Sequence, residues 1–341
     1  MIFESNDVKD QAMQDNTPLY TNSSMKSFDG VQPAMFTVKS HDVCSDWFGN
    51  RPPVYAKDKK ILLKHSENEA VSYLSIVNNS YKVIENKDWA APIHEQMISS
   101  FGEDMFSGNP NSCETKTTLT KNGAVTFVYY TFPAISTDIF TTNGHATSLK
   151  LKVIVKNTFD SSGKLLLYIG NIDSFCANGL ITGQYNMVSH SHRSSFKVLD
   201  FTSTFKNALK EWRTDSLKYR KMALAKVKDE DVWNLIYQMC DSKHYASSQE
   251  MITLPPNELE RTLSWKLYNR YLSKEKRQRG SNIFSVMSTL THYSSHNSDD
   301  FDMRRGNPDT IPTRIQTRQE KVAKWMDSKV WNNFVAQRVT V

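Results

Sequence analysis

The residues of this sequence that could do chemistry are cations and aromatic rings on segments that alternate like β-strands. In the segment 148–156, Leu149 and every second residue after it are apolar, and lysines occupy most of the positions between them. These lysines are Lys150, Lys152 and Lys156. Side chains on one face of a strand repeat about every 6.6–7 Å, close to the phosphate repeat of an extended single strand. The spacing predicts a row of ammonium groups along a nucleic-acid backbone, with an ordinary solvated sheet face as the alternative.

An aromatic segment lies just before it, at 125–132. Its rings are Phe127, Tyr129, Tyr130 and Phe132, and they fall on both faces of the expected strand. One face must pack in the core, and the other would offer rings on which bases stack, each worth about 1–3 kcal/mol. Rings beside lysines favour binding of single strands with little sequence preference. Core packing of all four rings is the competing interpretation.

A third polar cluster contains His190, His192, Arg193 and Lys197. Two histidines separated by one residue point to the same side of a strand and could share a metal ion, but no third ligand accompanies them. We therefore predict contacts with phosphate and no metal site, with structural hydrogen bonding as the alternative.

Basic residues are concentrated towards the C-terminus. Residues 206–341 hold 24 Lys/Arg and 16 Asp/Glu, a balance of +8, whereas residues 1–205 hold 18 and 20, a balance of −2. The predicted nucleic-acid contacts in this half are Lys206, Lys210, Arg213, Lys274, Lys276, Arg277 and Arg279. Each contact with phosphate releases condensed counterions, so binding should weaken with salt. The alternative interpretation is that these basic residues are solvated at helix ends and bind no nucleic acid.

The sequence lacks the motifs of the common catalytic sites. We find no P-loop, dinucleotide fingerprint, HExxH or nucleophile elbow. The acidic clusters are 229–231 and 299–302, which a nuclease would need as metal ligands, but carboxylates at 229–231 more simply begin a helix. We therefore predict a protein that is not an enzyme and uses no cofactor, and a nuclease is the alternative.

The segments that position these residues change their period near residue 203. Residues 36–202 follow period two, with the clearest hairpin at Asn122-Gly123, and from 203 the apolar residues follow a helical period. Residues 1–35 are polar and acidic, which predicts a flexible arm. The sequence thus predicts an α+β fold, with an antiparallel β-rich domain at 36–202 and a basic helical region at 203–341 packed on it.

No apolar run approaches the roughly 20 residues that span a bilayer, and the first residues lack the pattern of a signal peptide. These features predict a soluble cytoplasmic protein without a membrane partner.

Four segments carry a resemblance to a known family. They are 73–84, 149–169, 175–180 with His190 and His192, and the helical pair 267–269 and 286–293. They resemble a large family of phage- and plasmid-encoded proteins known only as a domain of unknown function, over about residues 60–300. In size and charge the chain also resembles phage single-stranded DNA-binding proteins that recruit a phage-encoded RNA polymerase to promoters. These resemblances imply a phage protein in the bacterial host cytoplasm, and they supply no catalytic residue.

The prediction that combines these features is a non-enzymatic phage protein that binds single-stranded DNA. Its expected role is in phage transcription, where it would recruit the phage RNA polymerase to unwound promoters. A recombination, annealing or replication protein is the main alternative, and an adaptor that binds only proteins is another. The sequence leaves the oligomeric state open. All of these DNA-binding hypotheses require exposed cations, and binding of single strands requires exposed rings beside them.

Overall fold

The computed structural model describes residues 23–45, 54–66, 69–173, 178–182, 188–192, 198–240, 259–295 and 311–339. The chain divides into two compact units that interleave along the sequence. Unit 1 comprises residues 1–134, 153–168 and 187–206, and unit 2 comprises residues 135–152, 169–186 and 207–341. The predicted division at 202/203 falls inside a helix, and the β-rich half contributes strands to both units.

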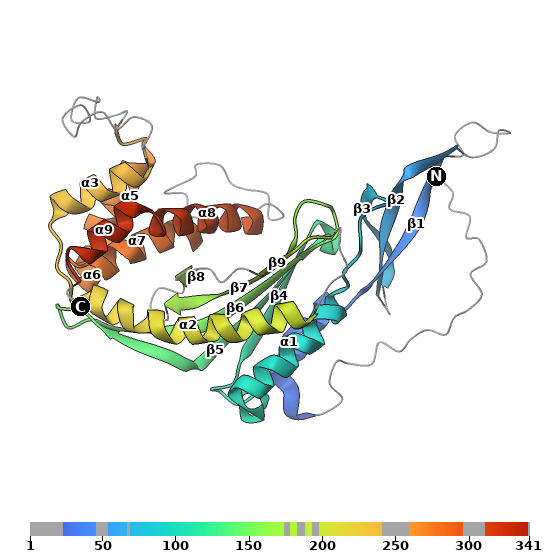
Figure 1. Ribbon diagram of the computed structural model, residues 1–341, viewed down its shortest axis with the longest axis horizontal. Coiled ribbons are helices and arrows are strands. Elements are labelled where there is room, and N and C mark those ends of the chain that lie inside the picture. The colour runs from blue at the N-terminus through green and yellow to red at the C-terminus, as the bar shows by residue number, and fades with distance from the viewer. Residues whose placement is uncertain are drawn as a thin grey trace. The chain divides into compact units, whose positions relative to one another are not determined.

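Unit 1 contains a three-stranded antiparallel sheet, drawn in blue in Figure 1. Its strands, in spatial order, are β1 (Thr37–Ser45), β2 (Val54–Ser66) and β3 (Glu69–Asn78). One face of this sheet is core, because Leu62, Leu74 and Val77 are buried in a cluster with Phe36 and Phe159. Burial of one face leaves the other free to carry polar or functional side chains.

The segment before β1 differs from the predicted arm. Residues Ser23–Ala34 form the 3-10 helix η1. Within it, Phe28 is buried and stacks on His94, with ring centroids 3.7 Å apart. The Thr117 hydroxyl donates to the carbonyl of Gly30 at 2.7 Å. The prediction of a flexible arm is therefore wrong for residues 23–34, because Phe28 anchors them, and residues 1–22 lie outside the described part.

Helix α1 (Asn86–Phe101) completes the core of unit 1. Its buried residues Trp89, Ile93 and Met97 follow the spacing of one helical face. Glu85 and Asp88 form a capping box at its start. The chain leaves the helix at Gly102, which has φ +86°, and continues into the short 3-10 helix η2 (Glu103–Phe106).

A second, larger sheet is built from the middle of the chain. Its strands are β4 (Glu114–Thr120), β5 (Val125–Phe140), β6 (Ala146–Thr158), β7 (Leu165–Asp173) and β8 (Asn178–Thr182), in that order, with β9 (Val188–His190) also paired to β7. The antiparallel pair β4–β5 is joined at Lys121–Gly123, where Asn122 and Gly123 have φ of 59° and 98°. This confirms the hairpin predicted there.

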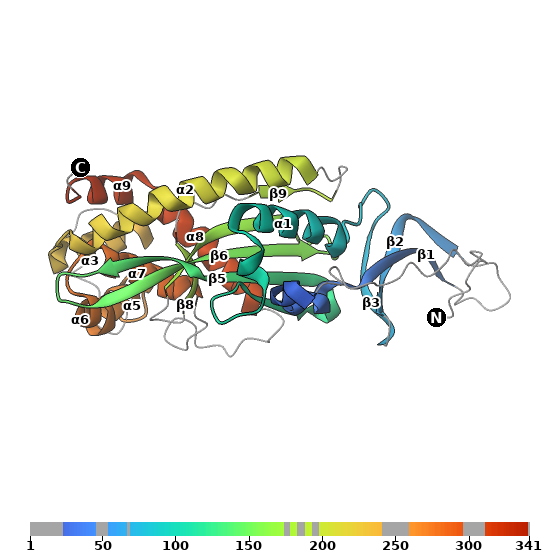
Figure 2. The same ribbon diagram turned by 90° about the horizontal axis from the view of Figure 1, so that it is seen from below.

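The helices of the second half are α2 (Val198–Leu224), α3 (Asp229–Cys240), α5 (Leu263–Arg270), the π-helix η5 (Tyr271–Glu275), α6 (Lys276–Arg279), α7 (Ile283–Ser295), α8 (Ile311–Met326) and α9 (Lys329–Ala336). In unit 2, α3 contacts α5 and α9, and α7 contacts α8 (Figure 2). The core of unit 2 joins these helices to Ile139 and Leu149 of the β5–β6 hairpin.

The predicted fold class is confirmed: antiparallel sheets occupy the first half and helices the second. Near the C-terminus the helical run is divided into α8 and α9, because Ser328 breaks it and caps α9 by accepting from the amide of Trp331. Across the described residues, no helix has an apolar stretch long enough to cross a bilayer.

Candidate nucleic-acid interface

The lysines predicted to form an exposed row on β6 are largely enclosed. Lys152 is 8% exposed and Lys156 is 5% exposed, while Lys150 is half-buried. Strand β6 lies between β5 and β7, and every residue from 151 to 159 is buried. The ammonium nitrogen of Lys156 lies 5.8 Å from the centroid of the Phe127 ring, which stabilises the buried charge. The expected exposed row is wrong, because both faces of β6 are covered.

The tyrosines predicted as stacking platforms on β5 are also withdrawn from solvent. Tyr130 is fully buried, and its hydroxyl lies 2.8 Å from Nε2 of His94. Burial lowers the pKa of His94 to about 3. Tyr129 is half-buried, and burial raises its pKa to about 12. Tyr130 is therefore a core residue, and Tyr129 offers little ring surface to a base.

The predicted histidine cluster divides in the same way. His192 is buried and stacks on Tyr81, with ring centroids 4.7 Å apart, and its Nδ1 lies 3.1 Å from the carbonyl oxygen of Lys82. Burial lowers the pKa of His192. The prediction of a phosphate contact by His192 is therefore wrong, while His190 is half-buried on β9. Arg193 and Lys197 lie outside the described residues.

In the C-terminal cluster the cations have different environments. Glu275, in the π-helix η5, is fully buried and forms ion pairs with Arg270 and with the equally buried Arg279. Lys276 pairs with Asp229 of α3 at 2.5 Å. The prediction that Arg279 contacts DNA is wrong, because this guanidinium neutralises a buried carboxylate. Lys274 and Arg277 are exposed, and their contact with DNA stays a prediction.

On helix α2, Lys206 and Lys210 are exposed, as the predicted contact requires. The side chain of Arg213 lies outside the described part of the structure. The exposed cations Lys206, Lys210, Lys274 and Arg277 remain candidates from the predicted set.

The hypothesis of single-strand binding requires an exposed ring and exposed cations on one surface. The open face of the sheet β1–β3 carries both. Cross-strand partners share a face, and the register places Lys39, Leu63 and Tyr73 in one row. His41, Ile61 and Ile76 lie in the next row, in which Ile61 is buried. We call this surface the outer face of β1–β3, and its residues are Lys39, His41, Lys59, Leu63, His65, Val71, Tyr73 and Ile76.

The outer face exposes an unusual amount of apolar surface. Val71, Tyr73 and Ile76 are 54%, 50% and 49% exposed, which places them among the few large apolar residues that the described structure leaves open. Apolar patches of this kind mark interaction sites. Tyr73 presents a ring that a base could stack on, and the aliphatic neighbours extend the contact.

Basic side chains lie on the same face, with Lys39 and His41 on β1, across β2 from Tyr73. Lys39 and His41 are exposed, and Lys39 and His41 both lower the pKa of His65, after burial as the first cause. The register pairs Thr37 with His65, so Lys39 lies one row and His41 two rows from His65 along the same face. Lys59 reaches Asn78 of the neighbouring strand at 2.5 Å. The rows Lys39–Leu63–Tyr73 and His41–Ile61–Ile76 contain no carboxylate, and the carboxylate paired with Lys59 is that of the exposed Asp58, at 3.9 Å.

Sequence reasoning missed this surface although signals for it were present. The segment 57–65 holds four lysines and a histidine, and the strand at 71–77 carries Tyr73. The register of β2 and β3 shifts between Leu62 and Leu63. This irregularity puts Leu74 in the core and leaves Tyr73 outside, which simple alternation alone does not assign to one face or the other.

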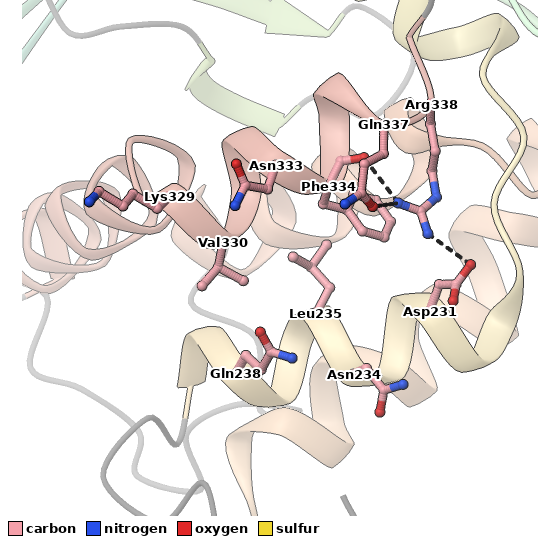
Figure 3. A pocket seen from close by; sticks show the side chains of 10 residues that line it. All are labelled: Asp231, Asn234, Leu235, Gln238, Lys329, Val330, Asn333, Phe334, Gln337 and Arg338. Atoms are coloured by element: carbon pink, nitrogen blue, oxygen red, sulfur yellow. Dashed lines mark hydrogen bonds and ion pairs between the residues drawn. The ribbon is translucent and has the colours of Figure 1, made fainter. Parts of the chain in front are cut away.

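Unit 2 also contains a cavity of about 350 Å³ between α3 and α9 (Figure 3). Leu235 and Phe334 form its apolar part, and its polar lining is rich in carboxamides, including Gln238 and Asn333. Arg338 closes one end through an ion pair with Asp231 at 2.9 Å. Because its charges are largely paired, this cavity is not a further site for a polyanion.

Within the described residues, no group of three or more His, Cys, Asp or Glu side chains is arranged to hold a metal ion.

Comparison with known proteins adds a family assignment. No curated protein and no solved structure matches the chain. A family model described as "Domain of unknown function (DUF932)" matches residues 73–328, which is most of the sequence. The chain therefore belongs to this family of unknown function.

Proposed function

We propose that this protein binds single-stranded DNA without catalysing a reaction, and that the outer face of β1–β3 is the surface that does so. The observation that carries the proposal is the half-exposed ring of Tyr73 on a sheet face that also exposes Lys39 and His41, two strands away on β1. Stacking on a ring is available to every base, because each base has a π-face, so such binding tolerates sequence.

The two kinds of group on this face have separate tasks. The ammonium groups of Lys39 and Lys59 neutralise phosphates and release counterions, which makes affinity depend on salt. The ring of Tyr73 takes an unpaired base, which a duplex keeps stacked inside. The ring therefore gives the preference for single strands over duplex, and the cations give affinity.

For the biological role we propose support of phage transcription, in which the protein holds an unwound promoter and recruits a phage RNA polymerase. The alternative is a recombination, annealing or replication protein, which would form large assemblies on DNA. Light scattering with and without an oligonucleotide separates these roles, since an annealing protein assembles into rings or filaments and a recruiting protein stays small.

The binding proposal is tested by substituting the ring. Tyr73→Ala should weaken binding of a fluorescent oligothymidine by about 5- to 150-fold, the loss of one stacked base. Tyr73→Phe should bind nearly as the natural protein does, because the ring remains. Fluorescence anisotropy at two salt concentrations measures both.

The matched control is Phe140→Ala, which removes another exposed ring, 64% exposed, from a different sheet. Its affinity should stay within about 2-fold of the natural protein. An unchanged affinity for Tyr73→Ala, an equal loss for Phe140→Ala, or a natural protein that does not prefer single strands would each refute the proposal.

A further inference from the structure

The solvent face of helix α2 forms a stripe of cations in unit 2. Lys210, Arg220 and Lys221 are exposed and are separated by ten and eleven residues, about three helical turns, so they share one side of the helix. The opposite side packs into the protein through Trp212, Tyr219 and Met222, which are buried. Two aliphatic residues, Leu217 and Leu224, lie close to these cations in the sequence and are 57% and 61% exposed.

The stripe continues past the end of the helix. Lys226 and Lys228 are exposed, whereas Ala225 before them and Val227 between them are buried. This alternation is fixed by the backbone: the amide of Ile283 donates to the carbonyl of Ala225 at 3.1 Å, and the amide of Val227 donates to the carbonyl of Ser281 at 3.1 Å. The two lysines therefore point outward from a segment that is held in place.

Charge on this stretch is of one sign. From residue 217 to residue 228 the sequence contains five cations and no acidic residue. All five are exposed: Lys218, Arg220, Lys221, Lys226 and Lys228. We call these five residues the basic stripe.

The basic stripe differs from the outer face of β1–β3 because the described part of it exposes no aromatic ring. Phe140, an exposed ring of β5, follows Ile139, which packs in the same core cluster as Tyr219. Since side chains alternate along a strand, Phe140 lies on the face of β5 opposite to Ile139. Without a ring, contact with a nucleic acid depends on charge. Charge-driven contact favours the partner with the densest phosphates, and a duplex carries one charge per about 1.7 Å of its axis.

We propose that the basic stripe is a binding surface for the phosphate backbone of duplex DNA. Charge complementarity is the argument for this partner over a protein or a lipid surface. The inference holds for the stripe whether or not the outer face of β1–β3 binds single strands. If the proposed function also holds, the chain carries one surface for single-stranded DNA and another for duplex DNA.

The test replaces three lysines of the stripe together, Lys221→Gln, Lys226→Gln and Lys228→Gln, in the full chain. Affinity for a fluorescent 20-base-pair duplex at low salt should fall at least tenfold. The slope of log affinity against log salt should fall by about 2–3, since each lost phosphate contact removes about 0.9. Circular dichroism and the melting temperature of the triple variant verify that it is folded.

The matched control removes the same charge from exposed lysines of α8 and α9, by Lys321→Gln, Lys324→Gln and Lys329→Gln. It should keep duplex affinity within about 3-fold. An equal loss in this control would show that net charge alone drives binding, and it would overturn the proposal. So would a natural protein that binds anionic phospholipid vesicles or polyglutamate more tightly than the duplex.

The two proposals fail in different ways. If Tyr73→Ala leaves binding of single strands unchanged while the triple variant loses the duplex, the proposed function fails and the stripe stands. If the triple variant keeps duplex affinity while Tyr73→Ala loses single strands, the stripe fails and the proposed function stands.

Discussion

In our proposals, the outer face of β1–β3 and the basic stripe at the end of α2 bind a polyanion in two different ways. The first has an exposed ring, Tyr73, among few cations, and the second has five exposed cations and aliphatic residues only. Stacking needs an unpaired base, whereas charge needs only phosphate. If both proposals hold, the presence of a ring, more than the number of cations, decides which form of DNA a surface prefers.

Salt should separate the two surfaces most strongly. If all five cations of the basic stripe contact phosphates, raising salt from 50 to 200 mM should weaken duplex binding on the order of 500-fold. Binding of single strands through Lys39 and Lys59 should weaken only about 7-fold over the same range. Anisotropy titrations measure both, with the single strand measured in the triple variant of the stripe. Similar losses for the two ligands would remove the distinction between the surfaces.

Acid should destabilise the unit that carries the ring. Folding keeps His94 neutral, since burial lowers its pKa to about 3, whereas the unfolded chain takes up a proton near pH 6.5. Its contribution to stability is complete above pH 6.5 and is lost progressively as pH falls towards 3. Lowering pH from 7.5 to 5 should therefore reduce the free energy of unfolding of unit 1 by about 2 kcal/mol.

Hydrogen exchange of the amides of α1 reports this loss, because His94 lies in that helix. The variant His94→Gln should show a shallower dependence of the α1 exchange on pH. A dependence as steep as that of the natural protein would assign the acid sensitivity to other groups.

An aromatic ring introduced next to the basic stripe should increase the affinity of the stripe for single-stranded DNA. Leu224 is exposed among the cations, so Leu224→Trp adds a stacking platform without removing charge. In a Tyr73→Ala background, the Trp variant should bind oligothymidine about 5-fold more tightly, the effect of one modest stacking contact. Leu224→Met is the control without a ring. Equal affinities for the two variants would mean that a ring does not determine strand preference.

The fold could be predicted from sequence more fully than the site. Alternating strands, the Asn122-Gly123 hairpin and the change to a helical period near 203 are local signals, and each corresponds to an element of the structure. The positions of exposed cations on α2 followed from the same kind of local periodicity. Such signals survive folding because they depend on neighbours in sequence.

Local sequence patterns could not predict which residues of the expected strands are exposed to solvent. Lys152 and Lys156 alternate like solvent-facing residues, yet β6 is an interior strand whose two faces are both covered. The Glu275–Arg279 ion pair likewise turns a residue of a basic run inward. Which strand is interior and which cation has a buried partner depend on contacts between distant segments, and a single sequence does not display them.

The central claim is that a base of single-stranded DNA stacks on Tyr73. Photochemical cross-linking of an oligonucleotide that carries 5-iododeoxyuridine, followed by mass spectrometry of the peptides, locates stacked aromatic residues directly. The account predicts an adduct on Tyr73 that a competing unlabelled single strand removes. Adducts confined to other peptides, with none on the strand Glu69–Asn78, would contradict it.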